Sequence, residues 1–206
     1  MEINFHQSSA DKSKNMEIKI EIGNANHAKY AQAICNIIEN AAKKRGTGIA
    51  KRKTEYIAKK LIEEKAVIAL KGEEVAGFSY IESWEHGKYV ANSGLIVAPQ
   101  FRKLGLAKRI KEQIFQLSRD KYPNAKIFGI TTSLAVLKIN SDLGYKPVTF
   151  SELPQDETFW KGCSTCPNFD ILTRTNKKMC LCTGMLAPSK VEAEQMKLDL
   201  SHLVIH

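Results

Sequence analysis

A basic, glycine-containing segment of this 206-residue sequence has the residue types that bind an anion. A strand-like stretch ends at Pro99, Arg102 and Lys103 follow in a short loop, and Gly105 leads into an amphipathic helix. The first N–H groups of a helix have no intrahelical partners and, together with the helix dipole, attract phosphate. Gly105 has no Cβ, and Ala107 keeps the next turn open, so a phosphate can approach the main chain closely. The segment therefore predicts a phosphate-binding turn.

The positive charge of the chain is concentrated in this segment and one other. Lys and Arg number 31 against 22 Asp and Glu, a net charge of +9. Residues 43–65 carry +6 and residues 102–121 carry +5, so the rest of the chain carries −2. Such charge suits nucleic acid, an anionic membrane surface or a small anionic ligand. Few aromatic residues are interleaved with the basic ones, which disfavours nucleic acid, and solvated helix faces remain the alternative.

A second group of polar residues is suited to a carboxylate-bearing substrate and to proton transfer. Arg52 lies at a predicted loop-to-helix junction, and arginine binds carboxylates through two parallel hydrogen bonds. Thr131 and Ser133 follow a predicted strand and offer hydroxyl groups. Glu82 is a candidate base for removing a proton from an amine, together with neighbouring Glu85 and His86. A solvated polar loop is the alternative interpretation of the last three.

Four cysteines lie close together in the sequence, in a C-x-x-C pair and a C-x-C pair: Cys163, Cys166, Cys180 and Cys182. Two such pairs can bind a tetrahedral zinc ion, although structural sites more often use two C-x₂₋₄-C pairs. Free reduced thiols are the favoured interpretation, so no metal is expected, and a zinc site and a disulfide are the alternatives.

The elements that position these residues follow from hydrophobic periodicity and turn signals. Strands are expected at 17–22, 66–70, 74–81, 89–97, 125–131, 146–150 and 179–186. Helices are expected at about 26–46, at 54–65, from 104 onward and at 134–143, with a marginal helix within 189–206. The order predicts one mixed α/β domain over residues 16–187, with a mobile leader at 1–15 and a tail at 188–206.

The cellular setting is expected to be cytoplasmic. No apolar run approaches the ~18 residues that a membrane span needs. The first 15 residues have neither the basic nor the apolar region of a secretory signal. We therefore expect a small-molecule partner, neither nucleic acid nor membrane, and leave a homodimer open.

The phosphate-binding segment resembles the pyrophosphate loop of the GCN5-related N-acetyltransferase family. Its pattern is Arg102-x-x-Gly105-x-Ala107 after a V-x-P strand end, and Leu143-Gly144-Tyr145 is similar to the family's L-G-F. The resemblance covers about residues 17–187. It implies an α/β (α+β) domain with a mixed, mostly antiparallel, splayed sheet flanked by helices. It also implies that acetyl-CoA or another acyl-CoA is the co-substrate.

The resemblance further implies roles for individual residues. The main chain of Leu95 and Val97 would pair with the pantetheine arm, and an N–H there would stabilise the oxyanion of the reacting thioester. Many relatives have a proton-donating tyrosine where this chain has Asn140, which cannot deliver a proton. The catalytic candidates are thus Leu95, Glu82 and the Asn140 position. The residues expected to bind the cofactor are Leu95, Ile96, Val97, Arg102, Lys103, Leu104, Gly105, Leu106, Ala107 and Lys108.

Three segments are similar to the N-acetylglutamate synthase branch of that family. They are residues 48–57, which include Arg52, the triplet Thr131-Thr132-Ser133, and residues 144–154. Ser133 stands where that branch has arginine. The branch implies acetyl transfer to the α-amine of glutamate or a related substrate of arginine biosynthesis, with Asn92 and Ser93 as further acceptor-binding candidates. The alternatives are transfer to a polyamine, an aminoglycoside or a protein lysine, and a non-catalytic acyl-CoA-binding protein.

Overall fold

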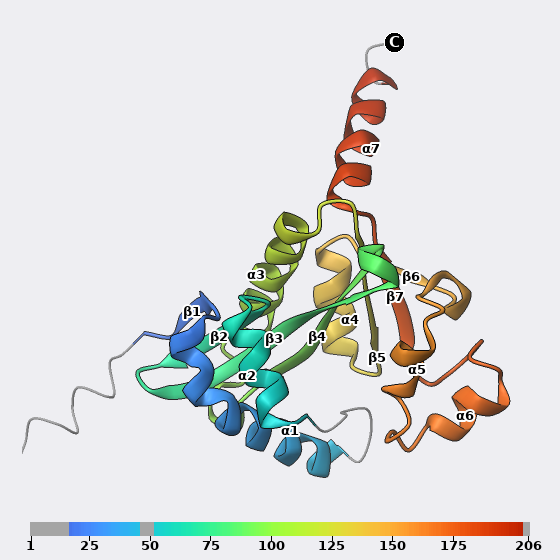
Figure 1. The fold of residues 1–206 in the computed structure, drawn as a ribbon. Coiled ribbons are helices and arrows are strands. Elements are labelled where there is room, and N and C mark those ends of the chain that lie inside the picture. The colour runs from blue at the N-terminus through green and yellow to red at the C-terminus, as the bar shows by residue number, and fades with distance from the viewer. Residues whose placement is uncertain (1–16, 46–51, 204–206) are drawn as a thin grey trace, which may run out of the picture.

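The strands form where β-branched and aromatic residues alternate with polar ones or run together between turns. In the computed structural model, which describes residues 17–45 and 52–203, they make one seven-stranded sheet in the order β1-β2-β3-β4-β5-β7-β6 (Figure 1). The strands are β1 (Lys19–Ile22), β2 (Ala66–Lys71), β3 (Glu74–Trp84), β4 (Tyr89–Val97), β5 (Lys126–Thr131), β6 (Lys146–Val148) and β7 (Thr183–Ala187). All neighbours are antiparallel except β4 and β5, which are parallel.

Helices cover both faces of this sheet. They are α1 (Ala31–Arg45), α2 (Thr54–Ile62), α3 (Leu106–Lys121), α4 (Leu134–Asp142), α5 (Glu157–Lys161), α6 (Phe169–Arg174) and α7 (Lys190–Leu203). Because side chains alternate along a strand, Ile68 packs with α1 and α2 on one face, while Val67 packs with α3 on the other. Helix α7 extends away from the sheet (Figure 1). No helix in the two described ranges has the length and apolar character that a bilayer crossing requires.

Strands β4 and β5 pair over a short distance and then separate. Their register covers three positions, which end at Ala91 opposite Phe128. Strand β4 continues to Val97 and β5 to Thr131. The two strands therefore form a fork whose first residues are Asn92 on β4 and Gly129 on β5.

A β-bulge alters β4 within this fork. Between the pairs Phe78–Ile96 and Tyr80–Ser93, β3 has one residue and β4 has two. Gly94 is one of the two and has a φ of 65°, the left-handed conformation of a glycine bulge. The extra residue of a bulge is unpaired, so main-chain groups of β4 next to Gly94 are released from the ladder with β3.

The sequence predicted all seven strands, and β4 has the predicted bounds. The α/β fold class with its mostly antiparallel, splayed sheet is confirmed. The last strand begins at Thr183 rather than Met179. Between β6 and β7, where no helix was expected, Trp160 and Leu172 place the short helices α5 and α6 over the sheet. The first helix starts at Ala31, because Asn24 caps a preceding 3-10 turn.

The marginal C-terminal helix is present as α7, and Val191 on this helix donates its N–H to Pro123 O at 3.3 Å. The predicted leader at 1–15 and residues 48–51 of the arginine-bearing segment lie outside the described residues.

The Gly94→Ala substitution should destabilise the protein by several kcal/mol, because it combines two costs. A Cβ at this position would meet the Tyr80 ring, and an alanine at positive φ costs roughly 1–2 kcal/mol by itself. Urea unfolding measures the change. Gly87→Ala is the matched control, since Gly87 has a φ of 87° and a Cβ there meets nothing within 4 Å. Equal losses in the two variants would contradict a bulge packed against Tyr80.

Candidate functional site

The loop before α3 has the geometry of an anion-binding turn. Lys103 and Gly105 have φ values of 65° and 70°, and a Cβ added to Gly105 would meet nothing within 4 Å. Helix α3 begins directly after Gly105, so the first N–H groups of the helix lie next to this open space and lack intrahelical partners. Arg102 donates from Nε to Val97 O at 3.2 Å, which ties the loop to the end of β4.

The other residues expected to bind the cofactor surround this turn and the fork. Leu106, the first residue of α3, is buried, whereas Leu104 is 61% exposed. Lys108 lies 3.8 Å from Asp142 of α4 and therefore spans the space between the two helices. Leu95 and Val97 pack toward α3 and Ile96 packs toward α1 and α2, which leaves their main chain in the plane of the sheet.

The two acceptor candidates on β4 bind neighbouring elements. Asn92 is buried and donates from Nδ2 to Ile114 O at 3.0 Å and to Ser118 Oγ at 2.9 Å, both on α3. The main-chain oxygen of Ser93 accepts a hydrogen bond of 3.0 Å from Ser79 Oγ. Asn92 thus connects the fork to α3, whereas Ser93 connects it to β3.

A cluster of charged residues lies at the end of β3, on the face covered by α2. The carboxylate of Glu82 is 3.3 Å from Nζ of Lys60, which comes from α2 and also donates to Ile81 O at 3.0 Å. Arg52 donates from Nε to the Tyr80 hydroxyl at 2.6 Å. The side chains of Lys60 and Glu82 are only 13% and 19% exposed, so this ion pair is largely shielded from water.

Burial moves the pKa values of Glu82 and Lys60 toward 7. Desolvation raises the pKa of Glu82 to about 7, while the positive charge of Arg52 opposes the rise. Desolvation lowers the pKa of Lys60 to about 8, with the charge of Lys65 acting in the same direction. A carboxylate whose pKa lies near 7 is suited to accept a proton at neutral pH.

Thr131 and Ser133 stabilise the start of α4. Thr131 Oγ1 accepts the N–H of Ser133 at 3.0 Å, and Ser133 is the N-cap residue, whose Oγ accepts the N–H of Val136 at 3.5 Å. Both hydroxyls therefore have structural partners at the end of β5. Glu85 also has a structural contact, because it accepts the N–H of Gln155 at 2.7 Å.

Asn140 lies on α4 beside the fork. It is 1% exposed and donates from Nδ2 to Met185 Sδ at 3.5 Å, and its Oδ1 has no hydrogen-bond partner among the residues that the structure describes. A Cβ added to Gly129, the first β5 residue beyond the paired region, would lie 3.8 Å from Asn140 Nδ2. An amide therefore lies against the β5 branch of the fork.

Two lysines near the fork and the cluster were not predicted from the sequence. Lys60 lies between Ile57 and Leu61 of the buried stripe of α2. Lys111 follows buried Ile110 on α3 and is itself only 2% exposed. In the sequence, each of these lysines lies at the edge of an apolar helix stripe. Lysines at such positions more often have their ammonium groups in solvent, so the pattern does not indicate burial.

The four cysteines line one small apolar pocket under α5 and α6, beside Trp160 and Phe150. All four are free thiols, and no group of three metal-ligating side chains in the described ranges is arranged to hold a metal ion. Burial raises the pKa of Cys163 to about 11 and that of Cys182 to about 12. These two thiols therefore remain protonated and pack as small apolar groups.

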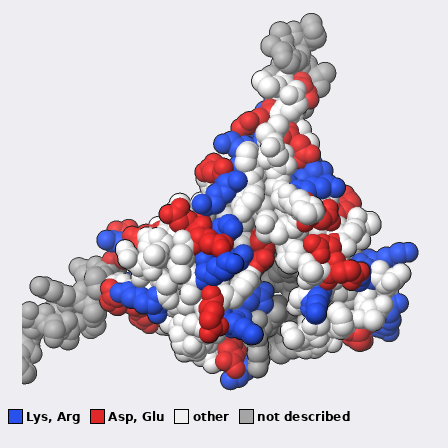
Figure 2. All heavy atoms as spheres, in the orientation of Figure 1, with Lys and Arg blue, Asp and Glu red and all other residues white. Residues whose placement is uncertain are grey.

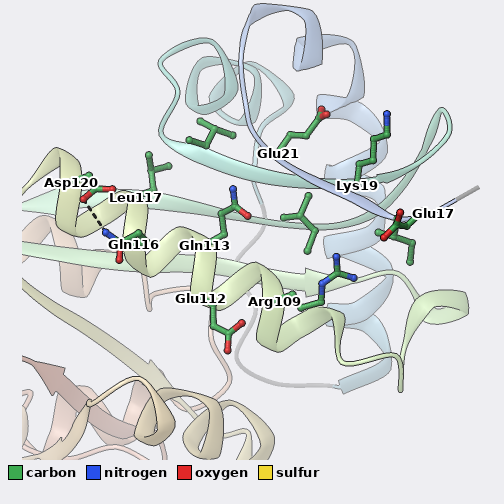
Figure 3. Close-up of a pocket in the computed structure, with 12 residues that line it drawn as sticks. Glu17, Lys19, Glu21, Arg109, Glu112, Gln113, Gln116, Leu117 and Asp120 are labelled. Atoms are coloured by element: carbon green, nitrogen blue, oxygen red, sulfur yellow. Dashed lines mark hydrogen bonds between the residues drawn. The ribbon is translucent and has the colours of Figure 1, made fainter.

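An open groove at the edge of the sheet is separate from the fork. It lies between β1 and α3, and charged residues from both elements, such as Lys19 and Arg109, line it (Figure 3). None of the predicted site residues belongs to it. In the space-filling view, Lys and Arg side chains lie among Asp and Glu side chains over the displayed face (Figure 2).

The family is shown by comparison with known sequences. The model of the acetyltransferase (GNAT) family matches residues 31–135, about half of the chain, and includes β4, the basic loop and α3. The chain therefore belongs to the GNAT family, as the motif around Gly105 indicated. A curated relative, the thialysine N-epsilon-acetyltransferase of Caenorhabditis elegans, is 44% identical over 69 residues, which are 31% of this chain and 43% of the relative.

Solved structures share the fold. An N-acetylglutamate synthase from Neisseria gonorrhoeae, complexed with coenzyme A and N-acetyl-glutamate, has a TM-score of 0.58 and 16% identity. The match covers 84% of this chain and 35% of that one. A putative acetyltransferase, yncA from Salmonella typhimurium with its cofactor acetyl-CoA, has a TM-score of 0.57 and 11% identity over 84% and 94% of the two chains. The chain thus spans less than half of the thialysine acetyltransferase and of the synthase.

The Lys60→Met substitution should raise the pKa of Glu82 by about one unit, because it removes the ammonium group 3.3 Å from the carboxylate. Carbon-detected NMR titration of the glutamate carboxyl groups measures this shift. Lys59→Met is the control, since Lys59 is 71% exposed and pairs with Glu63. An unchanged titration of Glu82 in Lys60→Met would show that the two groups do not interact in solution.

Proposed function

We propose that this protein is an acyl-CoA-dependent N-acyltransferase that moves an acetyl or related acyl group to the amine of an amino acid. The first candidate acceptor is the α-amine of glutamate or a related substrate of arginine biosynthesis. The observation that carries the proposal is the fork between β4 and β5, with an anion-binding turn at one end and the Glu82 cluster at the other. Free thiols are consistent with a reducing compartment, so a cytoplasmic location is part of the proposal.

The donor side of the proposal rests on the main chain. The pyrophosphate of acyl-CoA would bind the N–H groups at the start of α3, where Gly105 leaves space and Arg102, Lys103 and Lys108 add positive charge. The pantetheine arm would continue between α3 and α4 and pair with β4 where β5 has separated from it. The bulge at Gly94 supports this assignment, because it releases main-chain groups next to Leu95.

The acceptor side rests on charge. Arg52 and Lys60 give the α2 face of the fork positive charge that favours a carboxylate-bearing acceptor. A polycation such as a polyamine would be repelled there. Arg52 donates to the Tyr80 hydroxyl, and the Glu82 carboxylate is on the same face. One amino acid can thus place its carboxylate toward Arg52 and its amine toward Glu82.

The chemical steps follow from these positions. Glu82 removes a proton from the acceptor ammonium, directly or through a water molecule, and the free amine attacks the thioester carbonyl carbon. The N–H of Leu95 stabilises the negative charge that develops on the carbonyl oxygen, an interaction worth about 3 kcal/mol in comparable sites. The carbon–sulfur bond then breaks, and the coenzyme A thiolate takes up a proton.

A second acceptor is favoured by one observation. The curated relative with 44% identity over the aligned segment acts on thialysine, according to its name. Thialysine also carries a carboxylate, so Arg52 would bind it in the same way. The experiment is a thiol-release assay with acetyl-CoA and succinyl-CoA against glutamate, lysine, thialysine and a polyamine. Acceleration by glutamate supports the first acceptor and acceleration by thialysine the second, whereas no acceleration by any amino acid contradicts the proposed function.

Arg52→Gln should raise the KM for an amino acid roughly 10-fold or more and leave kcat nearly unchanged, because it removes a charged hydrogen bond to the carboxylate. Steady-state kinetics with the amino acid and with its α-decarboxylated amine measure this effect. The decarboxylated amine should show little change between wild type and variant. Lys53→Gln, at the adjacent exposed position, is the control. An equal effect on both acceptors would mean that Arg52 does not bind the carboxylate.

Gly105→Val should weaken coenzyme A binding at least about 10-fold, because a branched side chain would fill the space in front of the first N–H groups of α3. Isothermal titration calorimetry with coenzyme A measures the affinity. Gly87→Val is the control, since Gly87 also has a positive φ with open space around it but lies in the β3–β4 turn. Unchanged affinity in Gly105→Val would refute the loop as the pyrophosphate site.

A further inference from the structure

Lys111 is a buried cation for which the fold gives no ion-pair partner. It lies on α3, it is 2% exposed, and no carboxylate in the described ranges forms an ion pair with it. Its Nζ donates to the main-chain oxygen of Asn92 at 3.4 Å, a long bond, and lies 5.2 Å from the centre of the Tyr145 ring. Burying an ammonium group with so few favourable contacts costs folding free energy. In an enzyme, a catalytic role explains such a residue better than a contribution to stability does.

Lys111 lies beside the point where β4 and β5 separate. Asn92, whose oxygen it contacts, is the first β4 residue beyond the paired region. Tyr145, over which it lies, donates its hydroxyl to Asn92 Oδ1 at 2.9 Å. Asn140 occupies the corresponding place at Gly129 on β5. A buried ammonium group, that of Lys111, therefore lies beside the β4 branch, and a buried amide, that of Asn140, lies beside the β5 branch. Only the ammonium group has a transferable proton.

Lys111 lies on the face opposite Glu82. Lys111 belongs to α3, whose apolar residues pack with Ile81 and Val90, whereas Glu82 pairs with Lys60 of α2 on the other face. In the proposed reaction the amine approaches from the α2 face, and the pantetheine sulfur leaves on the face where α3 and α4 lie. The acid for the sulfur must then come from the α3–α4 face.

We propose that Lys111 is the catalytic acid that protonates the departing coenzyme A sulfur. The acceptor nitrogen bonds to the thioester carbon, the carbon–sulfur bond breaks, and its electron pair goes to sulfur. Lys111 transfers one proton to the sulfur and becomes a neutral amine. The acceptor nitrogen loses two protons between ammonium and amide: the first passes through Glu82 to water before the attack, and Glu82 holds the second. Exchange with water after product release returns Lys111 to ammonium and Glu82 to carboxylate. This inference rests on the proposed acyltransferase function.

The electrostatics of the site are compatible with this role. Burial lowers the pKa of Lys111 to about 7, so a proton can leave it at neutral pH. The titratable group that faces it is Tyr145, whose pKa burial raises, with the charge of Arg119 opposing the rise. Tyr145 is therefore a neutral phenol at neutral pH. Asn92 and Ser118 add uncharged polar groups from β4 and α3.

The decisive test measures the thiol of bound coenzyme A, which does not require the acceptor to be known. Lys111→Met keeps the length and the apolar stem of the side chain and removes the charge. A thiolate beside Lys111 stabilises the ammonium form, so the two groups titrate as a coupled pair. The thiol pKa of bound coenzyme A, followed by thiolate ultraviolet absorbance, should therefore be about one unit or more higher in Lys111→Met than in wild type. Lys121→Met, at the other end of α3, is the control.

Turnover provides the second measurement. With the acceptor found in the thiol-release assay, Lys111→Met should lower kcat at least about 10-fold and abolish the fall in kcat as pH rises above about 7, because that fall reports loss of the Lys111 proton. Calorimetry with coenzyme A shows whether the variant still binds. Failure of wild type to bind coenzyme A would contradict the proposed function. Tight binding with an unchanged thiol pKa and an unchanged pH profile in Lys111→Met would overturn the role of Lys111 alone.

Discussion

Parallel strands β4 and β5 share only three paired positions, and the main-chain groups beyond them must find partners outside the sheet. Side-chain hydrogen bonds hold the two branches of the fork in place. Asn92, Ser118 and Tyr145 join the β4 branch to α3 and to the chain after α4, while Thr131 and Ser133 join the β5 branch to the start of α4. The bulge at Gly94 adds a second break in the ladder, on the β3 side. Within the sheet, β4 and β5 therefore separate beside α3 and α4.

In the proposed reaction, two reactants would meet at the fork from opposite faces of the sheet. A carboxylate and an ammonium group, Glu82 and Lys111, lie on different sides of the sheet and do not neutralise each other. Each is desolvated instead, and desolvation shifts both pKa values toward 7 from opposite directions. In the proposed mechanism, separation by the sheet would thus keep Glu82 available as base and Lys111 as acid.

The sequence predicted what depends on local patterns. Alternation gave the strands, and the Arg102–Ala107 motif located the anion-binding turn and the family. The structure adds what depends on tertiary packing. Lys60 and Lys111 belong to two basic segments that were expected to neutralise substrate anions or face solvent, and only the packing of α2 and α3 shows that they are buried. Thr131 and Ser133 were considered for substrate, but their cap of α4 was not anticipated. The helices α5 and α6 escaped prediction because each is too short for a periodic signal.

An open sheet also has outer edges, and both are poorly suited to pair with another chain. Edge strand β1 has four residues, among them the charged Lys19 and Glu21. Edge strand β6 has three residues, and Pro147 has no N–H to offer. Short, charged or proline-containing edges are the usual protection against edge-to-edge aggregation. In the proposed function the interior fork would pair with a small molecule as a strand does, while the short outer edges resist the same kind of pairing with other proteins.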